Sequence, residues 1–248
     1  MRTALTIAGS DSSGGAGIQA DIKTMICNGV YAMSAVTALT AQNTTGVTGI
    51  MEVTPEFLGE QLDNIFTDIR PDAVKIGMVS SSSLIKTISD KLKKYDAKNI
   101  VVDPVMVATS GGELAKDDLS QNLLKYLLPK AILTTPNVSE AEKLTRIKIA
   151  DEEKAEIACE KLGKICNNII TGGHLNGTNI TCIDGKISTF KQELLKTDNV
   201  HGSGCNFSAA IVSYLSQKND LKTSILKASE YTYESIKNGK YGTLIAKL

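Results

Sequence analysis

Residues 4–17 read Ala4-Leu5-Thr6-Ile7-Ala8-Gly9-Ser10-Asp11-Ser12-Ser13-Gly14-Gly15-Ala16-Gly17. The first five form an apolar, β-prone run, which is typical of a strand buried on both faces. The glycines that follow allow backbone amides to approach a ligand closely where a helix begins. The alternative is a long turn with extra glycine. This stretch therefore predicts a buried strand that leads into a candidate binding loop.

Similar short runs recur along the chain and alternate with helical patterns. The predicted strands are Ala4–Ala8, Ala35–Ala41, Ala73–Met78, Asn99–Val105, Ala131–Thr135 and Asn168–Thr171. One predicted helix opens at Pro55, and the others are Ser82–Tyr95, Asp117–Leu128, Asp151–Cys166, Gly204–Ser216 and Leu221–Asn238. This alternation predicts a three-layer α/β fold, in which a mostly parallel central sheet has helices on both faces.

Near the last third of the chain the pattern changes. Ile180–Ile183 and Lys186–Phe190 flank Asp184-Gly185, which predicts a β-hairpin with a type I′ turn. Since the sequence contains no linker, low-complexity tract or internal repeat, we expect residues 1–248 to form one domain.

The charge balance excludes a strong net field. Lys plus Arg and Asp plus Glu both number 27 in the 248 residues, so no overall charge draws the molecule to nucleic acid or to anionic lipid. The apolar run before Gly9 is too short for a signal peptide or a membrane span. The five cysteines are scattered without a Cys-x-x-Cys pair, which favours free thiols over a metal site. We expect a cytoplasmic protein.

The glycine-rich loop does not match either of two common nucleotide-binding motifs. Residues 15–20 match the dinucleotide pattern G-x-G-x-x-A, but the glycines begin several residues too late after the strand. No acidic residue lies between Ile22 and Met51 to hold a ribose hydroxyl, as that motif requires. A Walker A loop is excluded because Gly14 is followed by glycine instead of lysine.

Polar residues lie at the carboxyl ends of three predicted strands. Ligands of parallel sheets usually bind at this edge. The carboxamide of Gln42 offers an acceptor and two donors that could pair with an aminopyrimidine edge, although such a stretch can also be only a turn. Asp103 ends a buried strand, where Mg²⁺ would suit it as a partner, unless it anchors a loop. Asn137 or Ser139 could cap a helix that has acids in its first turn, but Glu140 together with Asp103 also makes a candidate Mg·ATP site.

The segment Asn199-Val200-His201-Gly202-Ser203-Gly204-Cys205-Asn206-Phe207-Ser208-Ala209-Ala210 places small residues at the start of a clear helix. Exposed amides at a helix N-terminus form an anion hole for a phosphoryl group in transfer. The same positive field favours the thiolate form of Cys205, which would make it a proton acceptor. The alternative is that the glycines only begin the helix and the cysteine fills the core.

Taken in order, these pieces resemble the hydroxymethylpyrimidine and phosphomethylpyrimidine kinases of thiamine biosynthesis, in the ribokinase superfamily. The matching stretches are residues 8–23, Thr37-Ala38-Leu39, Ala41-Gln42-Asn43-Thr44, Lys75-Ile76-Gly77-Met78, Val102-Asp103-Pro104-Val105-Met106, Thr135-Pro136-Asn137 with Glu140, and His201-Gly202-Ser203-Gly204-Cys205. The resemblance implies a ribokinase-like fold. It also implies phosphoryl transfer from Mg·ATP to 4-amino-5-hydroxymethyl-2-methylpyrimidine, and a second transfer that gives its diphosphate.

The resemblance also implies roles for individual residues. Gln42 would hold the pyrimidine, in a pocket lined by Ala16, Gly17, Met78 and Val105. The anion hole would come from Gly202, Ser203 and Gly204, with Cys205 as the base. The metal and the phosphates would be ordered by Asp103, Asn137 and Glu140, and Thr171 and Gly173 would lie beside the ATP phosphates.

The chain departs from the family pattern at several positions. Thr171-Gly172-Gly173-His174 replaces Lys-Gly-Gly-His, so a cation expected near the ATP phosphates is missing. Thr109 stands where a lysine is frequent, and the tail after Gly242 is short. These changes predict slow turnover or a substitute lysine.

Two alternatives stay open. One is a pyridoxal or pyridoxine kinase of the same superfamily, although residues 41–44 favour the pyrimidine. The other is an inactive sensor that binds a nucleotide or a vitamin precursor. By analogy with the family we expect a homodimer.

Overall fold

The computed structural model describes residues 1–106 and 116–246, and its strands form one sheet in the order β3-β2-β1-β4-β5-β6-β7-β8-β9. The strands are β1 (Arg2–Asp11), β2 (Val30–Asn43), β3 (Gly46–Glu52), β4 (Ala73–Ile76), β5 (Ile100–Val102), β6 (Leu133–Thr134), β7 (Asn168–Ile170), β8 (Thr178–Ile183) and β9 (Lys186–Lys191). The neighbours from β2 through β7 are parallel, whereas β3, β8 and β9 pair antiparallel. Each predicted strand overlaps one of these.

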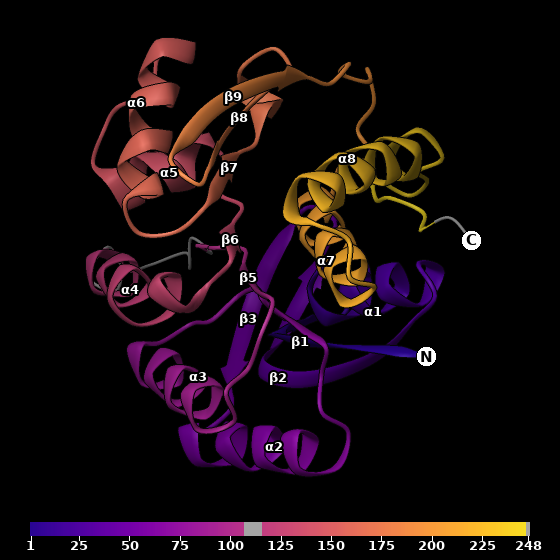
Figure 1. The fold of residues 1–248 in the computed structure, drawn as a ribbon. Coiled ribbons are helices and arrows are strands. Elements are labelled where there is room, and N and C mark those ends of the chain that lie inside the picture. Colours follow the sequence, from indigo (N-terminus) through magenta and orange to yellow (C-terminus); the bar gives the residue numbers. More distant parts are fainter. Residues whose placement is uncertain (107–115, 247–248) are drawn as a thin grey trace.

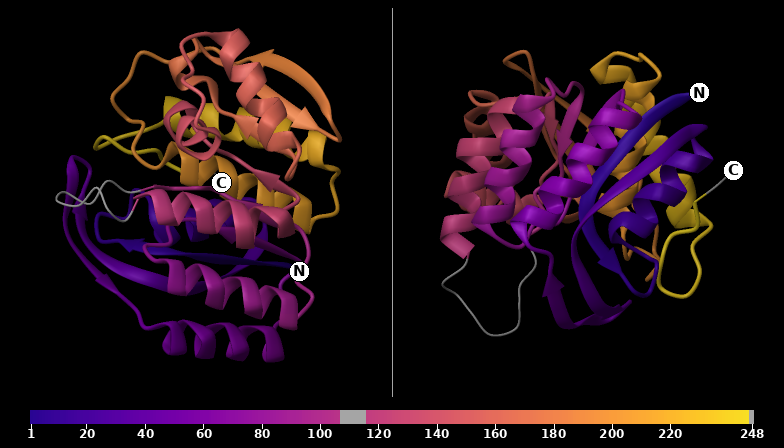
Figure 2. Two further views of the ribbon diagram at one scale, coloured as in Figure 1. Left: turned by 90° about the vertical axis from the view of Figure 1, so that its left-hand side faces the viewer. Right: turned by 90° about the horizontal axis from the view of Figure 1, so that it is seen from below.

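Helices cover both faces of the sheet (Figures 1 and 2). They are α1 (Gly17–Cys27), α2 (Pro55–Asp68), α3 (Ser82–Lys94), α4 (Lys116–Asn122), α5 (Val138–Thr145), α6 (Glu152–Gly163), α7 (Ser203–Ser216) and α8 (Leu221–Lys237). Within the described ranges none of them is long and apolar enough to cross a membrane.

Alternate residues of the central strands enter two different cores, which is why those strands read as continuously apolar. Ile100 and Val102 of β5 pack in a cluster with α2 and α3, whereas Val101 packs in a cluster with α7 and α8. The predicted three-layer α/β fold is confirmed.

The expected hairpin is present as β8 and β9, with Ile183 opposite Lys186. Its two turn residues, Asp184 and Gly185, have φ values of 50° and 74°. A type I′ turn requires positive φ at both of these positions.

A second hairpin, β2–β3, does not follow from the sequence pattern, because most residues of β3 are exposed and no apolar alternation marks it. Gln42 therefore lies in β2, near its end, and not in a turn. The turn is built by Asn43, whose Oδ1 accepts hydrogen bonds from the backbone of Thr45 and Gly46 at 2.9 and 3.0 Å.

The helix predicted for Asp117–Leu128 is interrupted. After Asn122 the chain forms a π-helical turn over Leu123–Leu127 and a 3₁₀ turn over Leu128–Lys130. Pro129 lies in that last turn, where it cannot donate a backbone hydrogen bond to continue an α-helix.

A fully buried ion pair lies at the centre of the sheet. Lys75 of β4 contacts Asp21 of α1, and neither side chain is exposed. Thr6 of β1 donates a hydrogen bond to the second carboxylate oxygen of Asp21 at 2.6 Å. Burial alone would lower the pKa of Lys75, but the charge of Asp21 and, more weakly, that of Asp103 raise it above its usual value. The ammonium is therefore charged at neutral pH.

We expect Lys75→Met to destabilise the fold by about 3–5 kcal/mol, because it leaves the carboxylate of Asp21 buried without a cation. The double variant Lys75→Met/Asp21→Asn should recover much of that loss, since both charges are gone. Urea unfolding of the three proteins measures the difference. A double variant as unstable as the single one would show that the ion pair is not the cause.

Candidate active site

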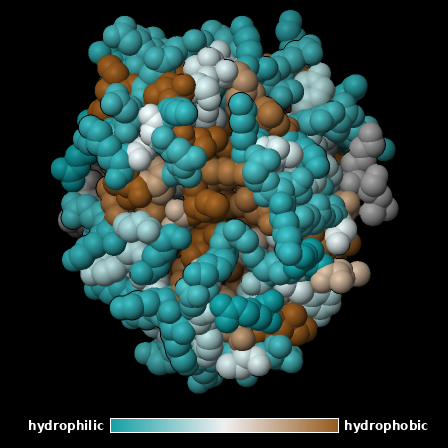
Figure 3. Space-filling model, in the orientation of Figure 1, coloured by the Kyte–Doolittle hydropathy of each residue, from teal (hydrophilic) through white to brown (hydrophobic). Residues whose placement is uncertain are grey.

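A cavity of about 460 Å³ opens at the carboxyl edge of the sheet, between the ends of the strands and helices α7 and α8. Figure 3 shows apolar surface gathered in the middle of this face, surrounded by polar side chains. A position beyond the carboxyl ends of parallel strands is the usual ligand site of such sheets. The lining includes most of the residues predicted from the sequence: Ala16, Gln42, Asp103, Val105, Asn137, Glu140, Thr171, Gly173, Gly202, Ser203, Gly204 and Cys205.

Gly17 and Met78, which were expected to line the pyrimidine pocket, are not among the residues that line this cavity. Gly17 begins α1 with a φ of +57°, and its backbone amide lowers the pKa of the Cys205 thiol. Met78 packs on the glycine-rich loop, since a Cβ added at Gly9 would lie 3.1 Å from the Met78 sulfur. Both residues support the cavity wall from behind.

The carboxylate of Asp11 organises the glycine-rich loop. It accepts hydrogen bonds from the amides of Ser13 and Ala16, each at 2.8 Å, and from the Ser13 hydroxyl at 3.0 Å. His201, from the segment before α7, lies with Nε2 2.9 Å from the same carboxylate. Burial alone would raise the pKa of Asp11, but these hydrogen bonds lower it. An ionised Asp11 thus joins two loops that are 190 residues apart.

Gly202 is the N-cap of α7 and has a φ of +88°. A Cβ at this position would lie 1.9 Å from the carbonyl oxygen of Gly15, so only glycine fits. The amide of Ser203 donates to Val200 O at 3.1 Å. Gly204 and Cys205 occupy the next helical positions, where amides have no carbonyl partner within the helix. Of the amides predicted to form an anion hole, that of Ser203 is thus already engaged by a carbonyl of the chain.

The prediction that Cys205 favours its thiolate form is wrong for this structure. Burial raises the pKa of the Cys205 thiol to about 12, and the nearby carboxylates of Asp21 and Asp103 add to the increase while Lys75 opposes it. Burial and the two acidic neighbours act against the positive field of the helix N-terminus. The sequence pattern could not reveal this because Asp21 and Asp103 approach Cys205 only in the folded chain.

Asp103 and Glu140 lie close enough to influence each other. Asp103 is 4% exposed and accepts a hydrogen bond from Ser208 at 2.9 Å. Asn137 and Glu140 form a reciprocal capping box at the start of α5, so the capping alternative is also correct. Burial, followed by the charge of Asp103, raises the pKa of Glu140 to about 8, and burial likewise raises the pKa of Asp103.

The cation expected near the phosphates is missing from the cavity wall. Among the described residues that line the cavity, none is lysine or arginine, whereas Asp103, Glu140 and Glu193 are acidic. Thr171 occupies the lysine position and is held by its amide, which donates to Pro136 O at 3.0 Å. Thr109 lies outside the described residues. Lys75 lies buried below the wall and is paired with Asp21.

Gln42 presents one face of its carboxamide to the cavity. The hydroxyl of Thr40 donates to its Oε1 at 3.0 Å, and Ser12 hydrogen-bonds its backbone on both sides. The same Thr40 hydroxyl also lies 2.9 Å from Ser10 O, so the carboxamide has its NH₂ donors and a lone pair of its oxygen to offer to a ligand.

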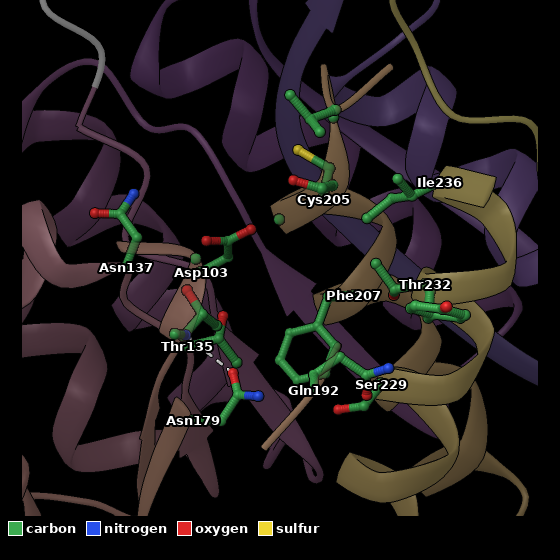
Figure 4. A pocket seen from close by; sticks show the side chains of 18 of the residues that line it. Asp103, Thr135, Asn137, Asn179, Gln192, Cys205, Phe207, Ser229, Thr232 and Ile236 are labelled. Atoms are coloured by element: carbon green, nitrogen blue, oxygen red, sulfur yellow. Dashed lines mark hydrogen bonds between the residues drawn. The ribbon is translucent and has the colours of Figure 1, made fainter. Parts of the chain in front are cut away.

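The sequence analysis missed the wall formed by β8, α7, α8 and the segment after β9 (Figure 4). Its lining residues are Asn179, Gln192, Phe207, Ser229, Thr232, Tyr233 and Ile236. The spacing of the four positions on α8 is that of one helical face, which was the available signal. Asn179 is fixed by the amide of Gly172, which donates to Oδ1 at 3.0 Å.

Comparison with known proteins gives a family match over almost the whole chain. The family model for phosphomethylpyrimidine kinase matches residues 11–245. The thiamine biosynthesis bifunctional protein of Geobacter sulfurreducens is 44% identical over 238 residues, which are 94% of this chain and 49% of that protein, so the chain spans about half its length. The hydroxymethylpyrimidine/phosphomethylpyrimidine kinase of Bacillus subtilis is 41% identical over 241 residues, 95% of this chain and 89% of that protein.

Solved structures agree. Phosphomethylpyrimidine kinase from Clostridium difficile superposes with a TM-score of 0.83 at 41% identity, over 95% of this chain and 100% of that one. An ADP complex of Bacillus subtilis pyridoxal kinase gives a TM-score of 0.91 at 32% identity, over 100% and 97% of the two chains. The motifs along the sequence, the fold and these matches lead to one conclusion: the chain belongs to the phosphomethylpyrimidine kinase family.

Proposed function

We propose that the protein transfers a phosphoryl group from ATP to 4-amino-5-hydroxymethyl-2-methylpyrimidine, and then to the monophosphate, in thiamine diphosphate biosynthesis. One observation carries this proposal: Gln42 and the N-terminus of α7 line the same cavity. The first offers hydrogen-bond donors to a heterocycle, and the second offers amides to a phosphoryl group in transfer. The proposal includes residues 1–248 acting as one ribokinase-like kinase domain, in a cytoplasmic homodimer.

Phosphoryl transfer depends mainly on positioning and on stabilising charge. In the proposed reaction the pyrimidine lies between Gln42, Ala16 and Val105, and its hydroxymethyl group points to Cys205. The amides of Gly204 and Cys205, with Gly202 and Ser203 shaping the turn, receive the charge that develops on the transferred group. The other wall, with Asn137, Thr171 and Gly173, receives the rest of the nucleotide.

The residues present fit a Mg²⁺ ion that arrives with ATP. No group of three His, Cys, Asp or Glu side chains placed to hold a metal occurs in the described part of the chain. Asp103 is buried and Glu140 is half-buried, and the charge of one raises the pKa of the other, so a divalent cation would relieve their repulsion. The ion would complete its oxygen shell with phosphate and water. When bound, it supplies charge neutralisation between the phosphates and the two carboxylates.

Cys205 is protonated in the free protein, since burial raises its pKa to about 12. We infer that it accepts the hydroxymethyl proton only in the complex with Mg·ATP, where the added positive charge beside Asp103 favours the thiolate. In the opposite account, the backbone amides alone support the transfer and the thiol is a wall of the pocket.

A second candidate function is phosphorylation of pyridoxal. The observation in its favour is the TM-score of 0.91 to Bacillus subtilis pyridoxal kinase, over the whole of this chain. The higher identity to pyrimidine kinases places it second.

The purified protein should release ADP much faster with the hydroxymethylpyrimidine than with pyridoxal in a coupled assay. Gln42→Ala should raise the KM for the pyrimidine by about 5- to 150-fold, which corresponds to 1–3 kcal/mol for a lost hydrogen bond whose partner stays buried. Asn64→Ala, an exposed amide on α2, is the matched control and should leave KM unchanged. Preference for pyridoxal would reverse the order of the two candidates, and ADP release with neither would favour the inactive sensor.

Activity should require Mg²⁺, and Asp103→Asn should raise the concentration needed for half-maximal rate by about tenfold or more, because one ligand charge is lost. Glu140→Gln should act in the same direction. Asp90→Asn, exposed on α3, controls for a general change in charge. If both site variants keep the Mg²⁺ requirement of the unmodified protein, these carboxylates only anchor the ends of β5 and α5.

Cys205→Ser should lower kcat by about 10²–10⁴-fold with little change in ATP affinity, since serine is a far poorer proton acceptor of similar size. Cys27→Ser, at the end of α1, is the matched thiol control. Because the Cys205 pKa is raised, iodoacetamide should react with this thiol only slowly at neutral pH in the free protein. A Cys205→Ser protein that works at full rate contradicts the base role.

A further inference from the structure

Thr135 follows β6 directly and lines the cavity, but no role follows for it from the sequence motifs or from the proposed reaction. The residue is 5% exposed, and within the described residues its Oγ1 has no hydrogen-bond partner. Leaving a buried hydroxyl unpaired is costly, so an unpaired hydroxyl at a cavity wall points to a partner that occupies the cavity.

The adjacent threonine shows what the fold itself requires. Thr134 is fully buried, and its hydroxyl donates to Val102 O at 2.8 Å. Thr135 contributes to the sheet only through its backbone amide, which donates to the same carbonyl at 3.1 Å. The two consecutive threonines therefore differ in one respect: the hydroxyl of Thr134 is used inside the sheet, whereas the hydroxyl of Thr135, a residue of the cavity lining, has no partner in the described chain.

The surroundings of Thr135 indicate the chemistry of its partner. In Figure 4 it lies beyond Asp103 as seen from Cys205, on the side of Asn137 and Asn179. Asp103 and Glu140 are acids in the same wall, and none of the described lining residues is lysine or arginine. With no lysine or arginine in the described lining, an anion must be bound by neutral donors, and the Thr135 hydroxyl is the buried one without a partner. A hydroxyl that donates to an ionised oxygen forms the stronger class of hydrogen bond.

We propose that the Thr135 hydroxyl donates a hydrogen bond to a non-bridging phosphate oxygen of the bound nucleotide. This inference rests on the proposed function, because it takes ATP as the phosphoryl donor. Thr135 is then a binding residue that compensates in part for the absent lysine at position 171. Its contribution is to nucleotide affinity, and the fold gains nothing from its hydroxyl.

The test compares three variants in titrations with Mg²⁺ and a non-hydrolysable ATP analogue. Thr135→Val, which keeps the shape and removes the hydroxyl, should weaken binding by about 10- to 100-fold, the usual effect of losing a hydrogen bond to a charged group. Thr135→Ser restores the hydroxyl and should bind within about threefold of the unmodified protein. Thr134→Val, the matched control, should bind the analogue normally.

Thermal unfolding distinguishes a binding role from a structural role, because only the loss of a structural hydrogen bond should lower Tm. Thr135→Val should leave Tm unchanged or raise it, because an unpaired buried hydroxyl is removed. Thr134→Val should lower Tm by about 1–4 °C, because a hydrogen bond inside the sheet is lost. A Thr135→Val protein with a lower Tm, or with binding within twofold of the unmodified protein, overturns the proposal.

Adenosine, which has no phosphate, identifies the part of the nucleotide concerned. Thr135→Val should bind adenosine as well as the unmodified protein does, and an equal loss for adenosine and for the ATP analogue would overturn the phosphate assignment. The proposed function itself is tested in the unmodified protein. If that protein neither releases ADP with the pyrimidine nor binds the ATP analogue, the proposed function fails, whatever the result for Thr135.

Discussion

The site depends on one buried interaction, the contact between the Lys75 ammonium and the Asp21 carboxylate. A charge in the centre of a sheet is tolerated only with a partner, so the contact sets the position of α1 against β4 and, through Thr6, against β1. Gly17 begins α1 with its amide against the Cys205 thiol. The Lys75–Asp21 contact thus fixes the position of α1 and, with it, the position of the glycine-rich loop that leads into this helix. The same ammonium offsets part of the negative charge of Asp103 and Asp21 beneath the cavity.

A second constraint comes from above the sheet. The Asp11–His201 contact and the close approach of Gly202 to Gly15 bring the first loop and the start of α7 together. Each loop supplies a different part of the site. The first supplies backbone amides that Asp11 holds in place, and the second supplies a helix N-terminus. Their junction forms one wall, so the site needs both ends of the chain. Motifs that lie far apart along the sequence therefore come together at one site in the folded chain.

Sequence reasoning succeeded where a single strand or turn carries its own signal. The apolar run within the predicted strand Asn99–Val105 forms β5 over Ile100–Val102, and Asp184-Gly185 specified the turn between β8 and β9. It failed at β3, where an exposed strand has no such pattern. In the site, the sequence placed Gln42 and Asp103 at the cavity, but it gave Cys205 the wrong electrostatic environment. The pKa of that thiol depends on Asp21 and Asp103, which are remote in sequence. The unpaired state of the Thr135 hydroxyl likewise becomes visible only when its neighbours are placed.

The acidic wall of the cavity has a consequence for which form of the nucleotide the protein can use. Its described lining carries Asp103, Glu140 and Glu193 with no lysine or arginine to balance them. Two polyanions of the same sign repel each other in a site of low dielectric constant. Where these acids are ionised they repel uncomplexed ATP more than its magnesium complex, which should therefore be the better ligand of the two. If the protein uses ATP as its magnesium complex, as we propose, the free magnesium concentration would determine how much of the nucleotide pool is available to it.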